Sequence, residues 1–248
     1  MSEDVTKTRR LVEDLRQQIV DGVLAPGVLL PTRAQLAAKY EVSETTARNA
    51  LKQLVHEGLV VSRTGSGHRV RERPPMVRLA RDRYHRNLPP FASEVRAQGR
   101  VPQVEWDSQR VPAPPAIAER LNIEPGDKVM RTTYVMTADG EVTQLSTSYE
   151  PLAITLGRGV ELPEAGQFRG LGVIARMGAI GIHVTEVTES PYARPPLAWE
   201  TERLRLAPGM WVMEIERTHW AGDRPVETAD IVLAADRYRP VYRIPVID

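Results

Sequence analysis

The sequence predicts an α+β protein of two domains, in which a small helical domain with a basic hairpin precedes a larger domain around one antiparallel sheet. The chain has 248 residues, a length that suits one large domain or two of ordinary size. Capping and turn signals divide the first part into three short helices and a hairpin. A repeated helix-turn-strand sequence in the second part predicts two related halves about one sheet. We therefore expect a first domain over residues 1–74, a linker over 75–90 and a second domain over 91–248.

Three helices are expected in the first domain. The first is predicted from apolar residues at helical spacing, namely Leu11, Leu15, Ile19 and Val20. Thr32 is a good N-cap for the second helix, and Gln35 three residues later completes the pattern of a capping box. Ser43 caps the third helix, whose buried face is formed by Ala47, Ala50, Leu51 and Leu54. The residues of this helix that point outward are Glu44, Thr45, Arg48, Asn49 and Lys52.

A basic hairpin follows these helices. Gly58 ends the third helix, residues 59–63 have the composition of a strand, and the chain turns and returns as a second strand over 68–72. Three helices followed by such a hairpin make a winged helix-turn-helix, which places its third helix in the major groove of DNA. Residues 1–74 hold 12 Lys/Arg and 9 Asp/Glu, a net charge of +3. A charge of this size supports a polyanionic partner only weakly.

The second part of the chain contains an internal repeat. The sequence ERLNIEPGDKVM at 119–130 matches ERLRLAPGMWVM at 202–213, an offset of 83 residues. In both copies a helix end leads through Pro-Gly into a strand, which turns at Asp and Gly before another apolar stretch. Two copies are too few for a solenoid, so the repeat predicts two related halves of one domain.

Composition and motifs exclude several classes of protein. The chain has no cysteine and hence no disulfide, thiolate metal site or cysteine nucleophile. No apolar run approaches the roughly 20 residues that span a bilayer, and the charged start MSEDVTKTRR lacks the apolar core of a signal peptide. The histidines show no metal-ligand spacing, and no catalytic motif stands out. We expect a cytoplasmic protein with no enzyme activity, metal, cofactor or membrane partner.

These segments together resemble a known family. The stretch from GVLAPGVLLPTRAQLAAKY to EGLVVSRTGSGHRV resembles the DNA-binding domain of GntR-type bacterial transcription regulators. The second part resembles the ligand-binding UTRA domain of their HutC subgroup, which is similar in fold to chorismate lyase. The segments that carry this second resemblance are FASEVRAQGRVP, the entry ERL…PGDKVM, ADGEV, SYEP and PVETADIVLAADRYR.

The resemblance implies DNA contacts from the third helix and the wing. Residues at matching positions are Ser43, Thr45, Thr46, Arg48, Thr64 and Gly65. The residues suit this role, because free amides and the helix dipole at Ser43 attract a phosphate, and Arg48 reaches a phosphate or a guanine edge. Further candidates from the exposed helix face and from the donors around Gly65 are Asn49, Arg63 and His68.

Two positions depart from the family pattern. The arginine that opens the second helix, Arg33, lies one residue earlier than usual, which rotates it by about 100° but leaves it in reach of the DNA backbone. Glu44 stands where the family often has an arginine that contacts guanine. Two explanations remain open for Glu44. It either favours the helix dipole as an acid in the first turn, or it accepts from cytosine N4 and so alters the operator.

The effector site is predicted by alignment with relatives that bind phosphorylated sugars. The two places where they present Arg-x-Arg to a phosphate are Tyr134 and Met136 here, and Gly170 stands in place of a serine. Arg131 lies one residue out of phase and is expected on the other side of the strand. Ser146 and Ser148 alternate inward, and Glu227 matches a position that binds effector hydroxyl or amine groups. We therefore expect an effector that is not a sugar phosphate.

The resulting expectation is a homodimeric repressor that binds a pseudo-palindromic operator. A small-molecule effector in the second domain would change its affinity for DNA. Two alternatives remain: a chorismate-lyase-like enzyme domain fused to a DNA-binding domain, and a regulator whose second domain serves only for dimerisation.

Overall fold

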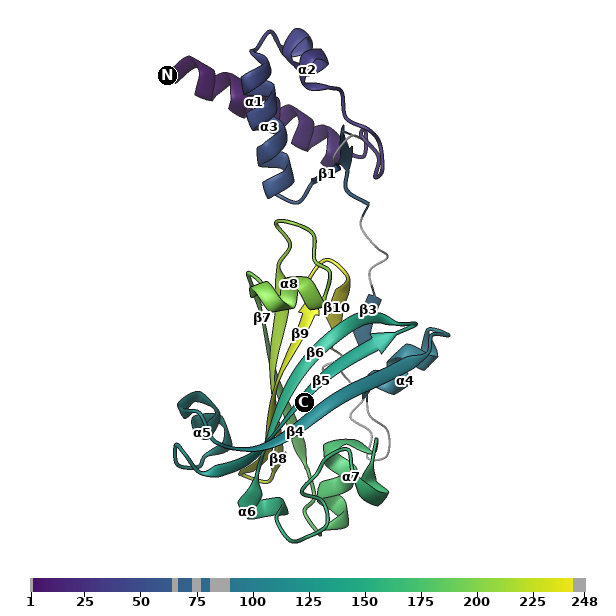
Figure 1. Ribbon diagram of the computed structural model, residues 1–248, viewed down its shortest axis with the longest axis vertical. Coiled ribbons are helices and arrows are strands. Elements are labelled where there is room, and N and C mark those ends of the chain that lie inside the picture. The colour runs from purple at the N-terminus through teal and green to yellow at the C-terminus, as the bar shows by residue number, and fades with distance from the viewer. Residues whose placement is uncertain (1, 64–66, 73–76, 81–89, 243–248) are drawn as a thin grey trace, which may run out of the picture. The chain divides into compact units, whose positions relative to one another are not determined.

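The chain divides into two compact units, described here from a computed structural model (Figure 1). The structure describes residues 2–63, 67–72, 77–80 and 90–242. The first unit contains Met1–Met76, and the second contains Val77–Leu204 and Trp211–Asp248. In the described part of the chain, no helix is both long and apolar enough to cross a membrane.

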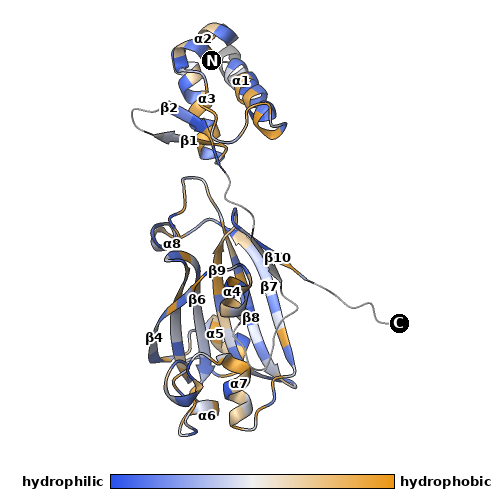
Figure 2. Cartoon of the chain, turned by 90° about the vertical axis from the view of Figure 1, so that its right-hand side faces the viewer, coloured by the Kyte–Doolittle hydropathy of each residue, from blue (hydrophilic) through white to orange (hydrophobic). Residues whose placement is uncertain are grey.

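The first unit is a winged helix-turn-helix, as the sequence predicts. Its elements are α1 (Ser2–Val20), α2 (Arg33–Tyr40), α3 (Glu44–His56), β1 (Val60–Arg63) and β2 (Gly67–Val70). The two strands pair antiparallel, and a bridge from Leu29 to Arg69 extends this hairpin. The helices are amphipathic (Figure 2), and Leu11, Leu36 and Leu54 lie in one core with no exposed area.

Local signals explain where these helices begin. Thr32 caps α2, and the predicted capping box with Gln35 is confirmed. Ser43 caps α3. The spacing of Leu11, Leu15, Ile19 and Val20 predicts that all four share one face of the first helix, but this is wrong for Val20, which is 68% exposed. Val20 is the last residue of α1 and immediately follows Ile19, so the two side chains point about 100° apart and only Ile19 packs on the core.

The second unit is built on a six-stranded antiparallel sheet in the order β4-β5-β6-β9-β8-β7. Its strands are β4 (Pro102–Pro112), β5 (Lys128–Ala138), β6 (Glu141–Pro151), β7 (Glu186–Arg194), β8 (Val212–Ala221) and β9 (Arg224–Ala234). The helices of this unit are α4 (Pro90–Ala97), α5 (Pro115–Leu121), α6 (Leu152–Thr155), η1 (Gly166–Phe168), α7 (Gly172–Ala179) and α8 (Ala198–Arg203). The predicted α+β class with a central antiparallel sheet is confirmed.

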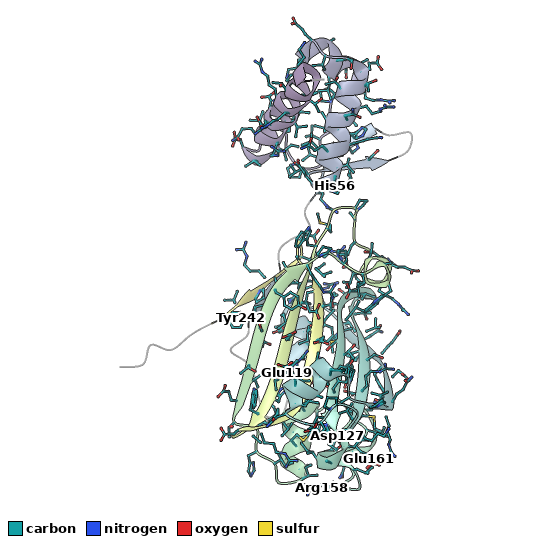
Figure 3. The ribbon with its side chains drawn as sticks, turned by 90° about the vertical axis from the view of Figure 1, so that its left-hand side faces the viewer. His56, Glu119, Asp127, Arg158, Glu161 and Tyr242 are labelled. Carbon is teal, nitrogen blue, oxygen red and sulfur yellow. The ribbon has the colours of Figure 1, made fainter. Side chains whose placement is uncertain are left out.

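The internal repeat corresponds to the two halves of this sheet. Glu119 and Asp127, labelled in Figure 3, belong to the first copy, in which α5 leads into β5. In the second copy α8 leads into β8. The strands β6 and β9 follow in the respective halves and pair with each other at the centre of the sheet.

A short strand lies within the segment expected to be a linker. Residues 75–90 were expected to be irregular, but β3 (Val77–Ala80) pairs in parallel with β10 (Tyr238–Val241). This pairing joins segments more than 150 residues apart along the chain. Such a distant partner leaves no local signal in a proline-rich and arginine-rich stretch.

Candidate DNA-contacting surface and effector site

The N-terminus of α3 is fixed by its cap. Ser43 has an extended backbone, and its Oγ accepts a hydrogen bond of 3.0 Å from the backbone N–H of Thr46. The two hydroxyls also lie 2.8 Å apart. Thr46, which the resemblance places among the DNA-contacting positions, is only 1% exposed, so it presents almost no surface to a partner. Its position four residues before Ala50 places it on the buried stripe of the helix.

The outward face of α3 is free of core contacts. Glu44, Thr45, Arg48 and Asn49 are all exposed. Three of them follow helical spacing, because Arg48 and Asn49 lie three and four residues after Thr45 and therefore share its side of the helix. Glu44 is the acidic residue of the first turn, where it favours the helix dipole. This face therefore presents one acid, one cation and two uncharged polar side chains.

The start of α2 and the wing lie near each other. Arg33 is the first residue of α2 and is exposed. Burial lowers the pKa of His68 on β2, and the positive charge of Arg33 lowers it further. Arg63 ends β1, whereas Thr64 and Gly65, both expected to contact DNA, lie outside the described residues.

The register of the large sheet brings the expected effector residues to one face. Tyr134 pairs with Ser146, and Thr132 pairs with Ser148. Directly paired residues point to the same side of a sheet, and so do residues two apart on a strand. Tyr134, Met136, Ser146 and Ser148 therefore share one side, which we call the Tyr134 face. The hydroxyl of Tyr134 donates no hydrogen bond to any residue that the structure describes.

Arg131 lies on the opposite face. It pairs with Tyr149 and is one residue out of phase with Thr132, as the alternation predicts. Its Nη2 donates a 2.7 Å hydrogen bond to Oε1 of Gln109. The structure thus separates Arg131 from the other effector candidates.

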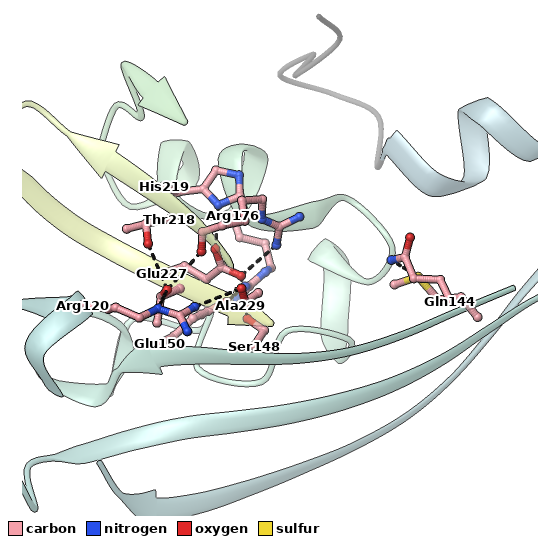
Figure 4. A network of polar contacts seen from close by, with 12 residues as sticks. Arg120, Gln144, Ser148, Glu150, Arg176, Thr218, His219, Glu227 and Ala229 are labelled. Carbon is pink, nitrogen blue, oxygen red and sulfur yellow. Dashed lines mark hydrogen bonds and ion pairs between the residues drawn. The ribbon is translucent and has the colours of Figure 1, made fainter. Parts of the chain in front are cut away.

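Glu227 is the centre of a buried polar cluster on the Tyr134 face (Figure 4). It is fully buried, and its Oε1 accepts hydrogen bonds from Ser148 Oγ at 2.8 Å and from Arg217 Nη2 at 2.9 Å. Its Oε2 lies 2.6 Å from Nδ1 of His219. Burial alone would raise the pKa of Glu227, but Arg217, His219 and Ser148 outweigh it and hold this pKa far below its usual range. Glu227 is therefore a carboxylate at neutral pH.

A second buried pair joins β6 to α7. Glu150 and Arg176 are each 1% exposed, and Nη2 of Arg176 donates to Oε1 of Glu150. Nη1 of Arg176 donates to the carbonyl oxygen of Val160 at 2.7 Å. Burial raises the pKa of Glu150, and the neighbouring Arg176 opposes this shift. The other oxygen of Glu150, Oε2, is buried and has no hydrogen-bond partner in the described structure.

Sequence reasoning missed four members of this site: Glu150, Arg176, Arg217 and His219. Alternation could have found Glu150, which lies two residues after Ser148 on the same strand. Arg217 and His219 lie on β8, and only the strand register shows that His219 pairs with Glu227. Arg176 comes from a helix that the sequence gives no reason to place against β6.

The fold and these two surfaces define a class of protein: a DNA-binding regulator with a separate domain of the ligand-binding type. Comparison with family models agrees. Residues 7–70 match the bacterial regulatory proteins of the gntR family, and residues 97–239 match the UTRA domain. The chain therefore belongs to the GntR family, and the combination with a UTRA domain is that of the HutC subfamily.

Relatives extend over the whole chain. An uncharacterized HTH-type transcriptional regulator of Streptomyces coelicolor is 31% identical and covers 100% of this chain and 96% of its own. A mannosyl-D-glycerate transport/metabolism system repressor of Escherichia coli is 30% identical over 59% of each chain. A crystal structure described as that of a GntR-family transcriptional regulator is 47% identical, covers 97% of this chain and 98% of its own, and has a TM-score of 0.82. The structure of PhnF from Mycobacterium smegmatis, 22% identical with a TM-score of 0.55, covers 96% of this chain and 100% of its own and supports the fold.

Proposed function

We propose that this transcription regulator is a repressor whose affinity for operator DNA is controlled by a small molecule bound on the Tyr134 face. The observation that carries the proposal is the buried polar cluster around Glu227, at a place where a sheet normally packs on an apolar core. Buried carboxylates and guanidiniums stabilise a fold less than apolar residues of similar volume. Ligand binding is a use that accounts for them in a UTRA domain. The name of the Escherichia coli relative supports repression.

On the DNA side, α3 is proposed to enter the major groove with its exposed face. Thr45, Arg48 and Asn49 have side chains that reach base edges and phosphates. A homodimer would place two such helices on a pseudo-palindromic operator. Effector binding would then alter how well both helices fit their half-sites, and DNA binding would alter effector affinity by the same factor.

Selection from randomised duplex DNA tests this part of the proposal. We expect a motif of two related half-sites, bound by the full chain in a fluorescence anisotropy titration at fixed salt. Glu44→Arg should move the preference toward guanine at one symmetric position per half-site if Glu44 contacts a base. An unchanged motif would leave Glu44 as a helix-dipole residue. Failure to select any motif would contradict sequence-specific binding.

The effector is proposed not to be a sugar phosphate. Arg176 and Arg217 on this face already pair with carboxylates. Arg110, whose strand pairing with Met130 places it on the same side, lies 3.8 Å from Glu161. Each of these guanidiniums is therefore already matched by a carboxylate of the protein. Calorimetric titration with hexose and hexosamine phosphates should show no binding. Binding of any of them at micromolar concentration would contradict the proposal. Arg131→Ala, on the opposite face, would show whether that arginine is responsible.

Two other functions for the second domain make different predictions. A chorismate-lyase-like enzyme would convert its ligand, and a module that only dimerises would bind none. A stabilising ligand that is recovered unchanged and releases the operator would favour the regulator. A metabolite library that never raises the melting temperature would favour the dimerisation module.

A further inference from the structure

One buried oxygen on the Tyr134 face lacks a hydrogen-bond donor. Glu150 is 1% exposed, Arg176 donates to its Oε1, and its Oε2 has no partner among the described residues. A buried carboxylate oxygen without a donor is costly, and such groups in native structures call for an explanation. A ligand that brings a donor to Oε2 would remove this cost.

Charged side chains of both signs lie on the same side of the sheet as this oxygen. Burial is the largest cause of the raised pKa of the Tyr134 hydroxyl. The carboxylates of Glu164, Glu150 and Glu227 raise this pKa further. The guanidinium of Arg176 opposes them, and Arg217 forms an ion pair with Glu227. His219 adds no charge at neutral pH, because burial lowers its pKa below the ordinary value of 6.5. Arg176 and Arg217 are thus held by carboxylates of the protein, whereas Oε2 of Glu150 accepts no hydrogen bond in the described structure.

Tyr134 supplies a surface that suits a cation. Tyr134 lies on β5 on the same side of the sheet as Glu150, which pairs with Met130 four residues earlier on that strand. The face of a tyrosine ring attracts an ammonium group electrostatically. Its hydroxyl makes no hydrogen bond within the described structure, so it is available as an acceptor as well as a donor.

We propose that the effector is a protonated amine whose N–H group donates to Oε2 of Glu150, on the side of the sheet that carries Tyr134. This inference rests on the proposed function, because it specifies the ligand class of the same site. A protonated amine supplies the missing donor, and its positive charge strengthens a hydrogen bond to a carboxylate oxygen. A carboxylate or phosphate head group would instead meet Glu150 as a like charge and leave Oε2 without a donor.

Four probes that share one aromatic body test the head group. They are 2-phenylethylamine, 2-phenylethanol, 3-phenylpropanoate and 2-phenylethyl phosphate, each titrated into the full chain by calorimetry and thermal shift. We expect the amine to bind roughly tenfold to a hundredfold more tightly than either anion, since a hydrogen bond to a charged group is lost with the anions. Equal or tighter binding of an anion, or no measurable binding of the amine, would overturn the proposal.

A matched variant distinguishes loss of the ligand contact from loss of the folded structure. Glu150→Leu combined with Arg176→Met replaces the buried pair by apolar side chains of similar volume, an exchange that folds typically tolerate. We expect this variant to lose its preference for the amine, whereas Arg131→Ala on the opposite face keeps it. Glu150→Gln, which retains shape but not charge, should weaken amine binding in a smaller step. Unchanged amine affinity in the double variant would refute the assignment to Glu150.

Operator binding by the same preparations distinguishes failure of the amine site from failure of the proposed function. If the double variant and the original chain bind the selected operator equally, the fold and the DNA-binding role stand whatever the probes show. Loss of the amine preference with retained operator binding then supports the amine site. If the original chain binds no operator, the proposed function fails first.

Discussion

Acidification is expected to destabilise the second domain through His219. This imidazole is 3% exposed, and its Nδ1 lies 2.6 Å from Oε2 of Glu227. Because Glu227 is a carboxylate and can only accept, Nδ1 of the neutral ring carries the proton. Burial lowers the pKa of His219 below 6.5, Arg217 lowers it further, and Glu227 opposes both. The folded protein therefore keeps this ring neutral at a pH where the unfolded chain protonates it.

The sign and size of the effect follow from proton linkage. Below pH 6.5 the unfolded state binds more protons than the folded state, so the free energy of unfolding falls as the pH falls. One histidine that stays neutral when folded costs about 1.4 kcal/mol between about pH 7.5 and about pH 5.5. The raised pKa of Glu150 acts in the opposite direction, since folding favours its protonated form above the ordinary value of 4.5.

Tryptophan fluorescence during urea unfolding measures this domain selectively. All four tryptophans lie between residues 106 and 220, and residues 1–76 contain none. The comparison is between the original chain and His219→Asn, whose amide nitrogen replaces Nδ1 without titrating. Glu150 is common to both proteins, so the difference between their pH dependences isolates His219. His183→Asn, at an exposed position, is the matched control.

The reasoning is refuted if the free energy of unfolding depends on pH in the same way in both proteins. If the original chain and His219→Asn lose the same stability between these pH values, the imidazole is not held neutral by its surroundings. A loss that also disappears in His183→Asn would assign the effect to exposed histidines.

Three further predictions concern the cap, the interface and the buried pair. Ser43→Ala should destabilise α3 by about 1 kcal/mol through loss of its N-cap bond, seen as faster amide hydrogen exchange in the first turns of that helix; unchanged exchange would contradict it. Arg48→Ala should weaken operator binding by roughly 1–3 kcal/mol in anisotropy titrations at fixed salt, and equal affinity would remove Arg48 from the interface. Glu150→Ala alone should lower the stability of the second domain by about 3–5 kcal/mol, because it leaves Arg176 buried without a counter-charge; a loss below about 1 kcal/mol in urea unfolding would show that Arg176 finds other partners.

The first domain is predictable from sequence because its determinants are local. The box between Thr32 and Gln35 and the cap at Ser43 each involve residues three apart, so the helix starts follow from short patterns. The burial of Thr46 is a local feature too, but its hydroxyl suggests exposure, and only its spacing from Ala50 shows otherwise. By contrast, β3 depends on β10 at the far end of the chain, which no local pattern reveals.

The proposed effector site is only half predictable for the same reason. Alternation along single strands places Tyr134, Ser146 and Ser148 on one side, and the structure agrees. The charged partners of Glu227 come from the neighbouring strand β8, and the partner of Glu150 comes from α7. Their positions depend on strand register and helix packing, which a single sequence does not specify.

The internal repeat connects these missed residues to the predicted ones. Adding its offset of 83 to Tyr134 and Met136 gives Arg217 and His219. The strand pairings agree with this two-fold relation: one row of the sheet runs through Tyr134, Ser146, Ile231 and Ile215, and the next through Thr132, Ser148, Ala229 and Arg217. If each residue is replaced by its counterpart 83 positions away in the other half, the first row becomes the second. Every side chain stays on the same face of the sheet. The positions that lack arginine on β5 therefore correspond to positions on β8 that carry Arg217 and His219. Arg217 already forms an ion pair with Glu227 on β9, so the second half supplies positive charge to the protein's own carboxylate. At the equivalent position of the first half, the hydroxyl of Tyr134 makes no hydrogen bond with any described residue, and this is the difference on which the proposed ligand site rests.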